Sequence, residues 1–268
     1  ITLLLAGFSA FEVLSYRWGV ASIVLIVFGW LSGCNFRLAG KDWGVVFLLS
    51  LLRAVTSFSL IIAYQNIASG VASTIHFMYP LAVALAMMFF FREKKSLLVI
   101  LAVLMSLLGA ALLSLGELEA KSGNTMVGLV AACVSVFSYA GYIVGVRTTR
   151  AVQINSTALT CYVMGLGTIF YLIGAYCTSG LQLVSDGYTW LIILGLALPA
   201  TAISNITLVQ AIKYAGPTLT SILGAMEPLT AVVIGVFVFK ELFTVNSAVG
   251  IILILLAVSI VVFRRQKS

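Results

Sequence analysis

The chain has 268 residues, of which 62% are hydrophobic and 9% are charged, and its formal net charge is +7. A soluble domain of ordinary composition carries about a quarter charged residues, so this chain would expose large apolar patches to water. The composition therefore excludes an ordinary soluble protein. It also removes the usual reason to connect a net positive charge with nucleic acid, and no nucleic-acid partner is expected.

Apolar runs of about 20 residues recur along the chain, which is the length of an α-helix that crosses a hydrocarbon core of ~30 Å. The runs are continuously apolar and do not alternate as the strands of a membrane β-barrel do. We therefore predict an all-α fold, a polytopic transmembrane helical bundle. The predicted helices span residues 10–31, 43–64, 70–91, 96–115, 126–146, 157–178, 188–211, 218–239 and 244–263.

Most charged residues lie in the short connections between these helices. When alternate connections are assigned to opposite sides of the membrane, eleven Lys and Arg residues lie on one side and two lie on the other. The positive-inside rule makes the first side cytoplasmic, which places the C-terminus in the cytoplasm and the chain in the cell (inner) membrane. The acids of the opposite side are Glu12, Glu117, Glu119, Asp186 and Glu241.

A gapless shift of 148 residues aligns two copies of one pattern, in which a helix with a central proline ends in a basic residue followed by Glu. The copies read Ser73…Met78-Tyr79-Pro80-Leu81…Arg92-Glu93 and Ser221…Met226-Glu227-Pro228-Leu229…Lys240-Glu241. Because an odd number of helices separates the copies, they cross the membrane in opposite directions. Inverted repeats are typical of secondary transporters, whose binding site lies near the bilayer midplane at the repeat interface.

The repeat predicts two domains, residues 1–118 and residues 124–264. In this register Ile1 aligns with Thr149, so the helix at 126–146 has no counterpart in the first half. We therefore expect a parent protein with two inverted five-helix repeats, ten helices in all, whose first helix is missing here.

The repeated pattern resembles EamA-type permeases of the drug/metabolite transporter (DMT) superfamily. The residues that carry the resemblance are Ala68-Ser69…Tyr79-Pro80…Phe91-Arg92-Glu93, Ala215-Gly216-Pro217-Thr218…Glu227-Pro228…Lys240-Glu241-Leu242 and Ser15-Tyr16-Arg17-Trp18. The shift places Gly165 where a second copy of Arg17 would stand, so the repeats differ there. The resemblance covers essentially the whole chain. It implies a ten-helix permease for small metabolites, often amino acids or related compounds and often as an exporter.

Ionisable side chains inside membrane helices are costly and tend to mark functional sites. Those that stand out are Arg17, Arg53, His76 and Glu227. Arg53 lies near the middle of its helix, on the same face as Ser57 and Tyr64. We interpret Arg53 as a residue that binds an anion or carboxylate, with pairing to an acid or solvation in a cavity as alternatives.

Glu227 is interpreted as a site for a substrate amine or a proton, and an ion pair with Arg17 or Arg53 is the alternative. Arg17 begins only about seven residues inside the membrane boundary, so its side chain can also extend outward to the interface. A cavity that contains both Arg53 and Glu227 would suit a zwitterion such as an amino acid.

Further substrate-binding candidates lie on polar stripes of the predicted helices. His76 has either a hydrogen-bonded structural role or the role of a gate that titrates near neutral pH. Asn205 follows Thr201 at helical spacing. The tyrosines expected to form cavity walls are Tyr64, Tyr79 and Tyr142.

Pro80 and Pro228 occupy equivalent positions of the two copies, and each removes one backbone donor from its helix. We interpret them as hinges for alternating access, and ordinary static kinks are the alternative. Pro199 has no proline counterpart at Leu51 and is interpreted as a plain kink.

The sequence therefore predicts a secondary transporter of small polar metabolites, most simply amino acids or related compounds. A membrane channel or receptor without a transport cycle is the alternative. A membrane enzyme is not expected, because the clustered acids or the nucleophile with a base that such chemistry needs are lacking. We expect no cofactor and no metal, protons as a further candidate partner, and a monomer or homodimer in the lipid bilayer.

Overall fold

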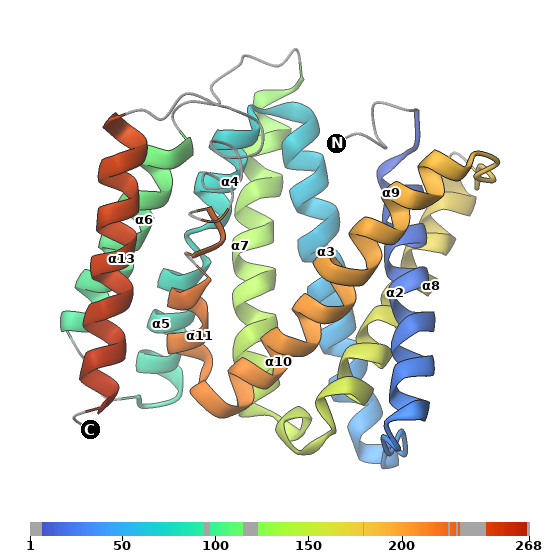
Figure 1. The fold of residues 1–268 in the computed structure, drawn as a ribbon, viewed down its shortest axis with the longest axis horizontal. Helices are drawn as coiled ribbons and strands as arrows, with labels where there is room; N and C mark the ends of the chain where they lie inside the picture. Colours follow the sequence, from blue (N-terminus) through green and yellow to red (C-terminus); the bar gives the residue numbers. More distant parts are fainter. Residues whose placement is uncertain are drawn as a thin grey trace. The chain divides into compact units, whose positions relative to one another are not determined.

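The computed structural model describes residues 7–93, 97–114, 123–178, 180–224, 226–228, 230 and 245–266. Over these residues the regular structure is helical throughout, as predicted, and no strand occurs (Figure 1). The helices are α2 (Ala10–Leu31), α3 (Trp43–Asn66), α4 (Ser69–His76), α5 (Tyr79–Phe90), α6 (Leu97–Ser114), α7 (Thr125–Thr148), α8 (Ser156–Thr178), α9 (Gly187–Ala197), α10 (Ser204–Ala215), α11 (Pro217–Leu223) and α13 (Val245–Gln266). Shorter helical segments are η1 (Gly40–Asp42), η3 (Arg150–Gln153) and η4 (Leu198–Ile203), of which η4 is a π-helix.

Six helical segments in the described part of the chain are long and apolar enough to cross a membrane, by length and composition. They are Ala10–Leu31, Gly40–Asn66, Ser69–Phe90, Thr125–Thr148, Ser156–Thr178 and Gly187–Ala215. Two further helices are also apolar but shorter, Leu97–Gly109 and Ala248–Ile260. The prediction of a polytopic transmembrane helical bundle is confirmed.

Three of the predicted helices differ in detail from those observed. The helix expected at 70–91 is interrupted between α4 and α5, and the helix expected at 188–211 is interrupted by η4. Both interruptions lie next to a proline, whose ring and missing N–H prevent a regular helical turn. The helix expected at 218–239 begins as α11, and its part from residue 231 lies outside the described residues.

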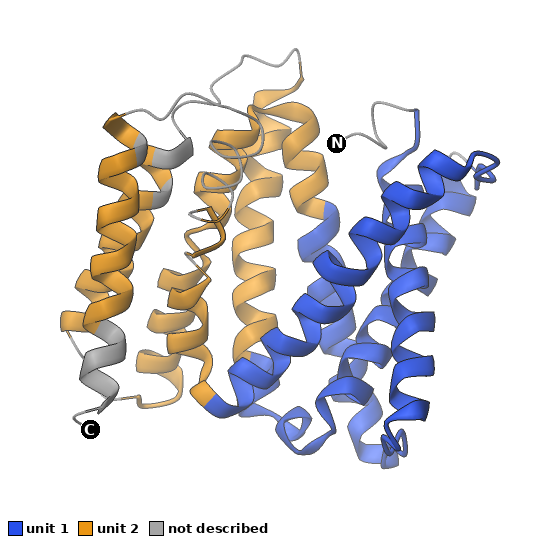
Figure 2. Ribbon diagram, viewed as in Figure 1, with its two compact units in different colours: residues 1–58, 145–214 blue, residues 59–144, 215–268 orange. Residues whose placement is uncertain are grey.

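The chain divides into two compact units, each of which combines segments from both halves of the sequence (Figure 2). Unit 1 contains residues 1–58 and 145–214, and unit 2 contains residues 59–144 and 215–268. The units therefore do not coincide with the repeats at 1–118 and 124–264, which remain a prediction from the sequence. Each unit is described by itself.

In unit 1 the closest helix pairing joins α2 to α8, its counterpart under the 148-residue shift. A Cβ atom on Gly167 would lie 2.2 Å from the ring of Trp18, and one on Gly174 would lie 2.5 Å from the ring of Phe11. Early residues of α2 thus face late residues of α8, so the two helices are antiparallel. Opposite directions of equivalent helices are what two inverted copies require.

Unit 2 repeats this arrangement with α6 and α13, which are also equivalent under the shift (Figure 1). A Cβ atom on Gly109 would lie 2.7 Å from the carbonyl oxygen of Gly250. Ala102, earlier in α6, shares an apolar cluster with Ala257, later in α13. This pair therefore also runs antiparallel, so each unit contains a packed antiparallel pair of helices that the 148-residue shift relates.

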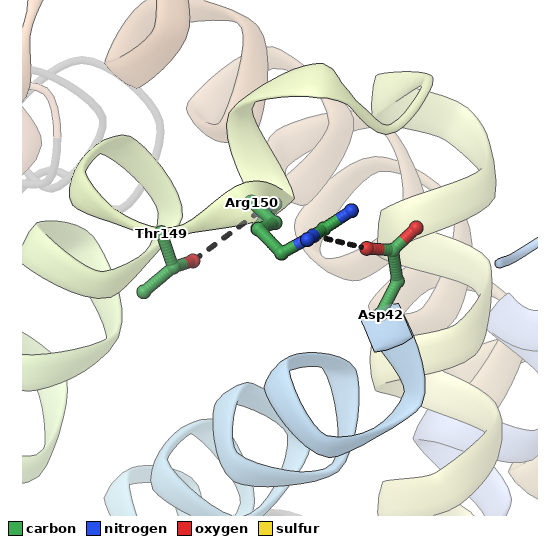
Figure 3. Close-up of polar contacts among 4 residues, drawn as sticks. Asp42, Thr149 and Arg150 are labelled. Carbon is green, nitrogen blue, oxygen red and sulfur yellow. Dashed lines mark hydrogen bonds and ion pairs between the residues drawn. The ribbon is translucent and has the colours of Figure 1, made fainter. Parts of the chain in front are cut away.

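Three connections that the sequence assigns to the basic side meet at one end of unit 1. The Nε atom of Arg150 lies 3.0 Å from Oδ1 of Asp42 (Figure 3), and Nη1 of Arg147 donates to the carbonyl of Lys213 at 2.5 Å. The ammonium of Lys213 in turn bonds the carbonyl of Ile154. The connections around residues 42, 150 and 213 thus lie together, as the alternation of loops predicts. We name this the basic end of unit 1.

The opposite end of unit 1 contains Glu12, which belongs to a capping box at the start of α2. Its carboxylate accepts the backbone N–H of Ser9 at 2.8 Å, and the Ser9 hydroxyl accepts the N–H of Glu12 at 3.3 Å. The same carboxylate accepts the N–H of Gln182 at 2.6 Å. Glu12 therefore joins the start of α2 to the connection between α8 and α9.

We expect that Gly167→Ala destabilises the protein by about 1–3 kcal/mol, because the added methyl group overpacks the buried Trp18 ring. Gly19→Ala is the matched control, since it is the repeat equivalent of Gly167 and its Cβ would meet Thr168 at an ordinary 3.4 Å. Thermal unfolding in detergent measures the difference between the two variants. Equal stability of the two would contradict the close packing of α2 on α8.

Candidate functional site

The central polar cluster of unit 1 joins residues that are equivalent under the internal repeat. The shift of 148 residues takes Arg53 and Ser57 of α3 onto Thr201 of η4 and Asn205 of α10. In the structure Nε of Arg53 donates to Oδ1 of Asn205 at 3.2 Å, and Nη1 donates to the hydroxyl of Ser57 at 3.1 Å. Arg53 thus bonds the residue that is equivalent to Ser57 under the shift.

The cluster lies near the middle of the helices that form it. Arg53 is the eleventh of the 24 residues of α3, and Thr201 lies at the centre of the apolar segment Gly187–Ala215. In a membrane of ordinary thickness, these positions are close to the midplane. The predicted candidates Arg53, Ser57 and Asn205 are therefore brought together at the depth where inverted-repeat transporters hold their substrates.

The second arginine, Arg17, reaches the same region from α2. Its Nε donates to the hydroxyl of Thr201 at 2.5 Å, and its Nη2 donates to the carbonyl of Ala200 at 3.1 Å. The side-chain amide of Asn205 donates to the carbonyl of Thr201 at 2.7 Å, which connects the Arg17 and Arg53 contacts. The Arg17 guanidinium is thus directed at η4.

The π-helix η4 explains why Arg17 can bond the hydroxyl of Thr201 and the carbonyl of Ala200. Pro199 supplies no backbone N–H, so the helix opens into a wider turn over Leu198–Ile203. The hydroxyl of Thr201 donates to the carbonyl of Leu196 at 2.8 Å, and the hydroxyl of Ser204 donates to the carbonyl of Ala200 at 3.0 Å. Side chains therefore satisfy carbonyls that a regular helix would use internally, and they do so beside both arginines.

Two buried aromatic side chains form a platform for Arg53. The guanidinium carbon of Arg53 lies 5.9 Å from the centroid of the Trp18 ring, within the range of a cation–π contact. Tyr171 meets Trp18 edge-on at 5.1 Å, and its hydroxyl donates to the carbonyl of Ala54 at 2.8 Å. Trp18 and Tyr171 are 1% and 2% exposed, so both rings are fixed by packing.

The sequence does not single out Trp18 or Tyr171 as site residues, because an aromatic residue in an apolar helix usually belongs to the core. The proximity of Trp18 to Arg17 in the chain is the available signal. Tyr171 carries no comparable signal, since only the folded packing of α8 brings it to Trp18 of α2 and to Ala54 of α3, next to Arg53.

The candidates of unit 2 form an aromatic cluster around His76. Its Nδ1 lies 2.9 Å from the hydroxyl of Ser135, and its ring stacks on Tyr139 with centroids 5.4 Å apart. Tyr79 meets Tyr139 edge-on at 4.6 Å, and Tyr142 stacks on Tyr139 at 6.5 Å. The structure thus joins His76, Tyr79 and Tyr142 through Tyr139, and Tyr79 and Tyr142 are both buried.

The other candidates of unit 2, Tyr64 and Glu227, make hydrogen bonds outside this stacked group. The hydroxyl of Tyr64 lies 3.1 Å from that of Ser73, a contact between the end of α3 and α4. Glu227 is exposed, and its backbone N–H donates to the carbonyl of Gly224 at 3.0 Å. Arg17 and Arg53 belong to unit 1, whereas Glu227 and His76 belong to unit 2.

The two predicted hinge prolines follow equivalent interruptions of their helices. α4 ends at His76 and Pro80 is the second residue of α5. The shift takes His76 onto Gly224, and α11 ends one residue earlier, before Pro228. Because Pro80 has no N–H for the carbonyl of residue 76, the sequence itself accounts for the end of α4 at that point.

The described residues contain no group of three or more His, Cys, Asp or Glu side chains that could hold a metal ion. All four cysteines of the chain are free thiols. The candidate site of unit 1 consists of guanidinium, amide and hydroxyl groups on an aromatic platform. Such groups recognise an anion or a polar organic molecule.

Comparison with known proteins gives concordant results. The model of the EamA-like transporter family matches residues 1–115 and 126–263. A protein of Archaeoglobus fulgidus named "Uncharacterized transporter" is 28% identical over 238 residues, which is 88% of this chain and 83% of that protein. A solved crystal structure of another protein matches 100% of this chain and 94% of that one, with a TM-score of 0.81 at 18% identity, which shows a common fold.

Proposed function

Because the chain belongs to the EamA-like transporter family, we propose that it is a secondary transporter of small polar metabolites and works by alternating access. Amino acids or related compounds are the proposed substrates. The observation that supports this most is the position of Arg53, which is held on Trp18 and hydrogen-bonded to Asn205 near the middle of α3. The planar guanidinium is suited to bind a carboxylate by two parallel hydrogen bonds.

Two hydrogen-bond partners of Arg53 support a carboxylate-binding role. Asn205 and Ser57 are neutral groups that orient the guanidinium. Asn205 is 2% exposed and is itself held by the carbonyl of Thr201, so the donor geometry is fixed before a ligand arrives. A preorganised donor loses less entropy when it binds a ligand. Glu227 remains the proposed group for a substrate amine or a proton.

We expect that Arg53→Gln lowers transport efficiency, kcat/KM, for a carboxylate-bearing substrate by about 10- to 150-fold, because a hydrogen bond to a charged group contributes about 1.5–3 kcal/mol. Arg150→Gln is the matched control, since it removes a guanidinium from a surface ion pair with Asp42 (Figure 3). Such pairs contribute about 0–1 kcal/mol, and transport should be preserved.

The assay uses purified protein in liposomes, screened against radiolabelled amino acids and nucleosides with and without a pH gradient. Saturation and counter-flow would identify a carrier, whereas a channel shows neither and a receptor shows no flux. Unchanged transport in Arg53→Gln would refute the carboxylate-binding role of Arg53. A flux that depends on the pH gradient would identify protons as the coupling ion.

The interruptions before Pro80 and Pro228 support alternating access, because broken helices provide places where two half-helices can change their angle. We expect Pro80→Ala and Pro228→Ala to lower kcat several-fold with little change in KM, since a restored backbone donor stiffens the break. Pro217→Ala is the control, because a proline at the first helical position carries no such penalty. Wild-type kinetics in both hinge variants would favour static kinks.

We also propose that the basic end of unit 1 faces the cytoplasm, with the chain in the inner membrane and the C-terminus inside. In a cysteine-free background, a membrane-impermeant maleimide should label Ser185→Cys on intact cells and leave Asn35→Cys unlabelled until the cells are permeabilised. Both positions are exposed residues of connecting segments. The reverse labelling pattern would invert the proposed orientation.

A further inference from the structure

An apolar pocket of about 430 Å³ lies in unit 1 between α2, α8 and the connection from α2 to α3. Its size falls within the range of ligand pockets, about 300–1,000 Å³. The main lining residues are Ser22, Ile26, Phe36, Trp43, Tyr162 and Ile169. None of these lining residues belongs to the candidate transport site described above.

The pocket begins at the basic end and extends along α8 towards the middle of the helix. Phe36 and Trp43 flank the connection that contains Asp42, and Tyr162 lies in the second turn of α8. From Tyr162 to Ile169 the helix rises by about 10 Å. The walls are open to the surroundings of the protein, since Ile26 and Ile169 are each 51% exposed.

The mouth of the pocket is aromatic and structurally fixed. The ring of Tyr162 meets Trp43 edge-on at 5.5 Å and Phe36 at 6.5 Å. The Tyr162 hydroxyl donates to the carbonyl of Phe36 at 2.6 Å, which holds the connection against α8. Tryptophan and tyrosine at a helix end are typical of the membrane interface, where headgroups and acyl chains meet.

Two basic residues lie close in sequence to the aromatic residues of this mouth. Arg37 follows Phe36 directly, Lys41 precedes Trp43 by two positions, and both are exposed. The one acid of this connection, Asp42, is engaged by Arg150 at 3.0 Å (Figure 3). The local charge at the mouth is therefore positive, and basic pockets beside transmembrane helices are suited to anionic lipid headgroups.

We propose that this pocket is a binding site for an anionic phospholipid of the surrounding bilayer. One acyl chain occupies the apolar pocket between Ile26 and Ile169, and the phosphate lies against Arg37 and Lys41. Because the bilayer interior is as apolar as the pocket, the acyl chain contributes little to the free energy of binding. Selectivity for an anionic headgroup therefore comes from the two basic residues, and a neutral phospholipid binds less well.

The test measures quenching of Trp43 fluorescence by phospholipids with brominated acyl chains in vesicles that contain the full chain. Brominated phosphatidylglycerol is compared with brominated phosphatidylcholine at equal mole fraction, and subtraction of the Trp43→Phe variant isolates the signal of Trp43. Each basic residue near an anionic headgroup changes binding by about fivefold. The wild type should therefore prefer the anionic lipid by about fivefold or more.

The double variant Arg37→Gln/Lys41→Gln should lose this preference and quench equally with both lipids. Both substitutions are at the surface, so folding should persist. Arg92→Gln, an exposed arginine of unit 2, is the matched control and should keep the preference. Equal quenching of wild-type Trp43 by the two lipids, or a preference that survives in the double variant, would overturn the proposal.

Discussion

Inside a hydrocarbon layer, backbone amides and carbonyls have no water to bond with, so they must be satisfied within the protein. Most of the described chain meets this requirement with regular helices. The exceptions are the gap between α4 and α5, the π-helix η4 and the end of α11. At η4 the carbonyls of Leu196 and Ala200 are taken by the hydroxyls of Thr201 and Ser204 and by Arg17. Polar side chains therefore gather where the helix is broken, and the candidate site lies there.

Positions that the 148-residue shift relates agree more closely in backbone structure than in side-chain identity. α2 and α8 are equivalent and antiparallel, and so are α6 and α13. The equivalent side chains nevertheless differ, because Thr201 stands where the first copy has Arg53 and Gly165 stands where it has Arg17. Both arginines of the polar cluster therefore come from the first copy.

The sequence predicts the helices well, because they depend on local composition and on residues at fixed spacing. It also draws attention to Arg53, Ser57 and Asn205, which the structure brings together, since a polar residue in an apolar helix is conspicuous. It does not predict η4 as a π-helix, because a proline only indicates that a regular turn must fail and not which geometry replaces it. Trp18 and Tyr171 are missed because aromatic residues in apolar helices are the ordinary content of a core.

The guanidinium of Arg53 lies near the middle of a membrane-spanning helix, where a charged group is costly. On insertion scales an arginine at a helix centre costs about 2.5–3.5 kcal/mol. A hydrogen bond to a charged group contributes about 1.5–3 kcal/mol, and a cation–π contact contributes about 0.5–2 kcal/mol. The bonds to Asn205 and Ser57 and the Trp18 contact are thus of the size needed to offset the cost. The fold thus supports the Arg53 guanidinium at this depth without any bound ligand.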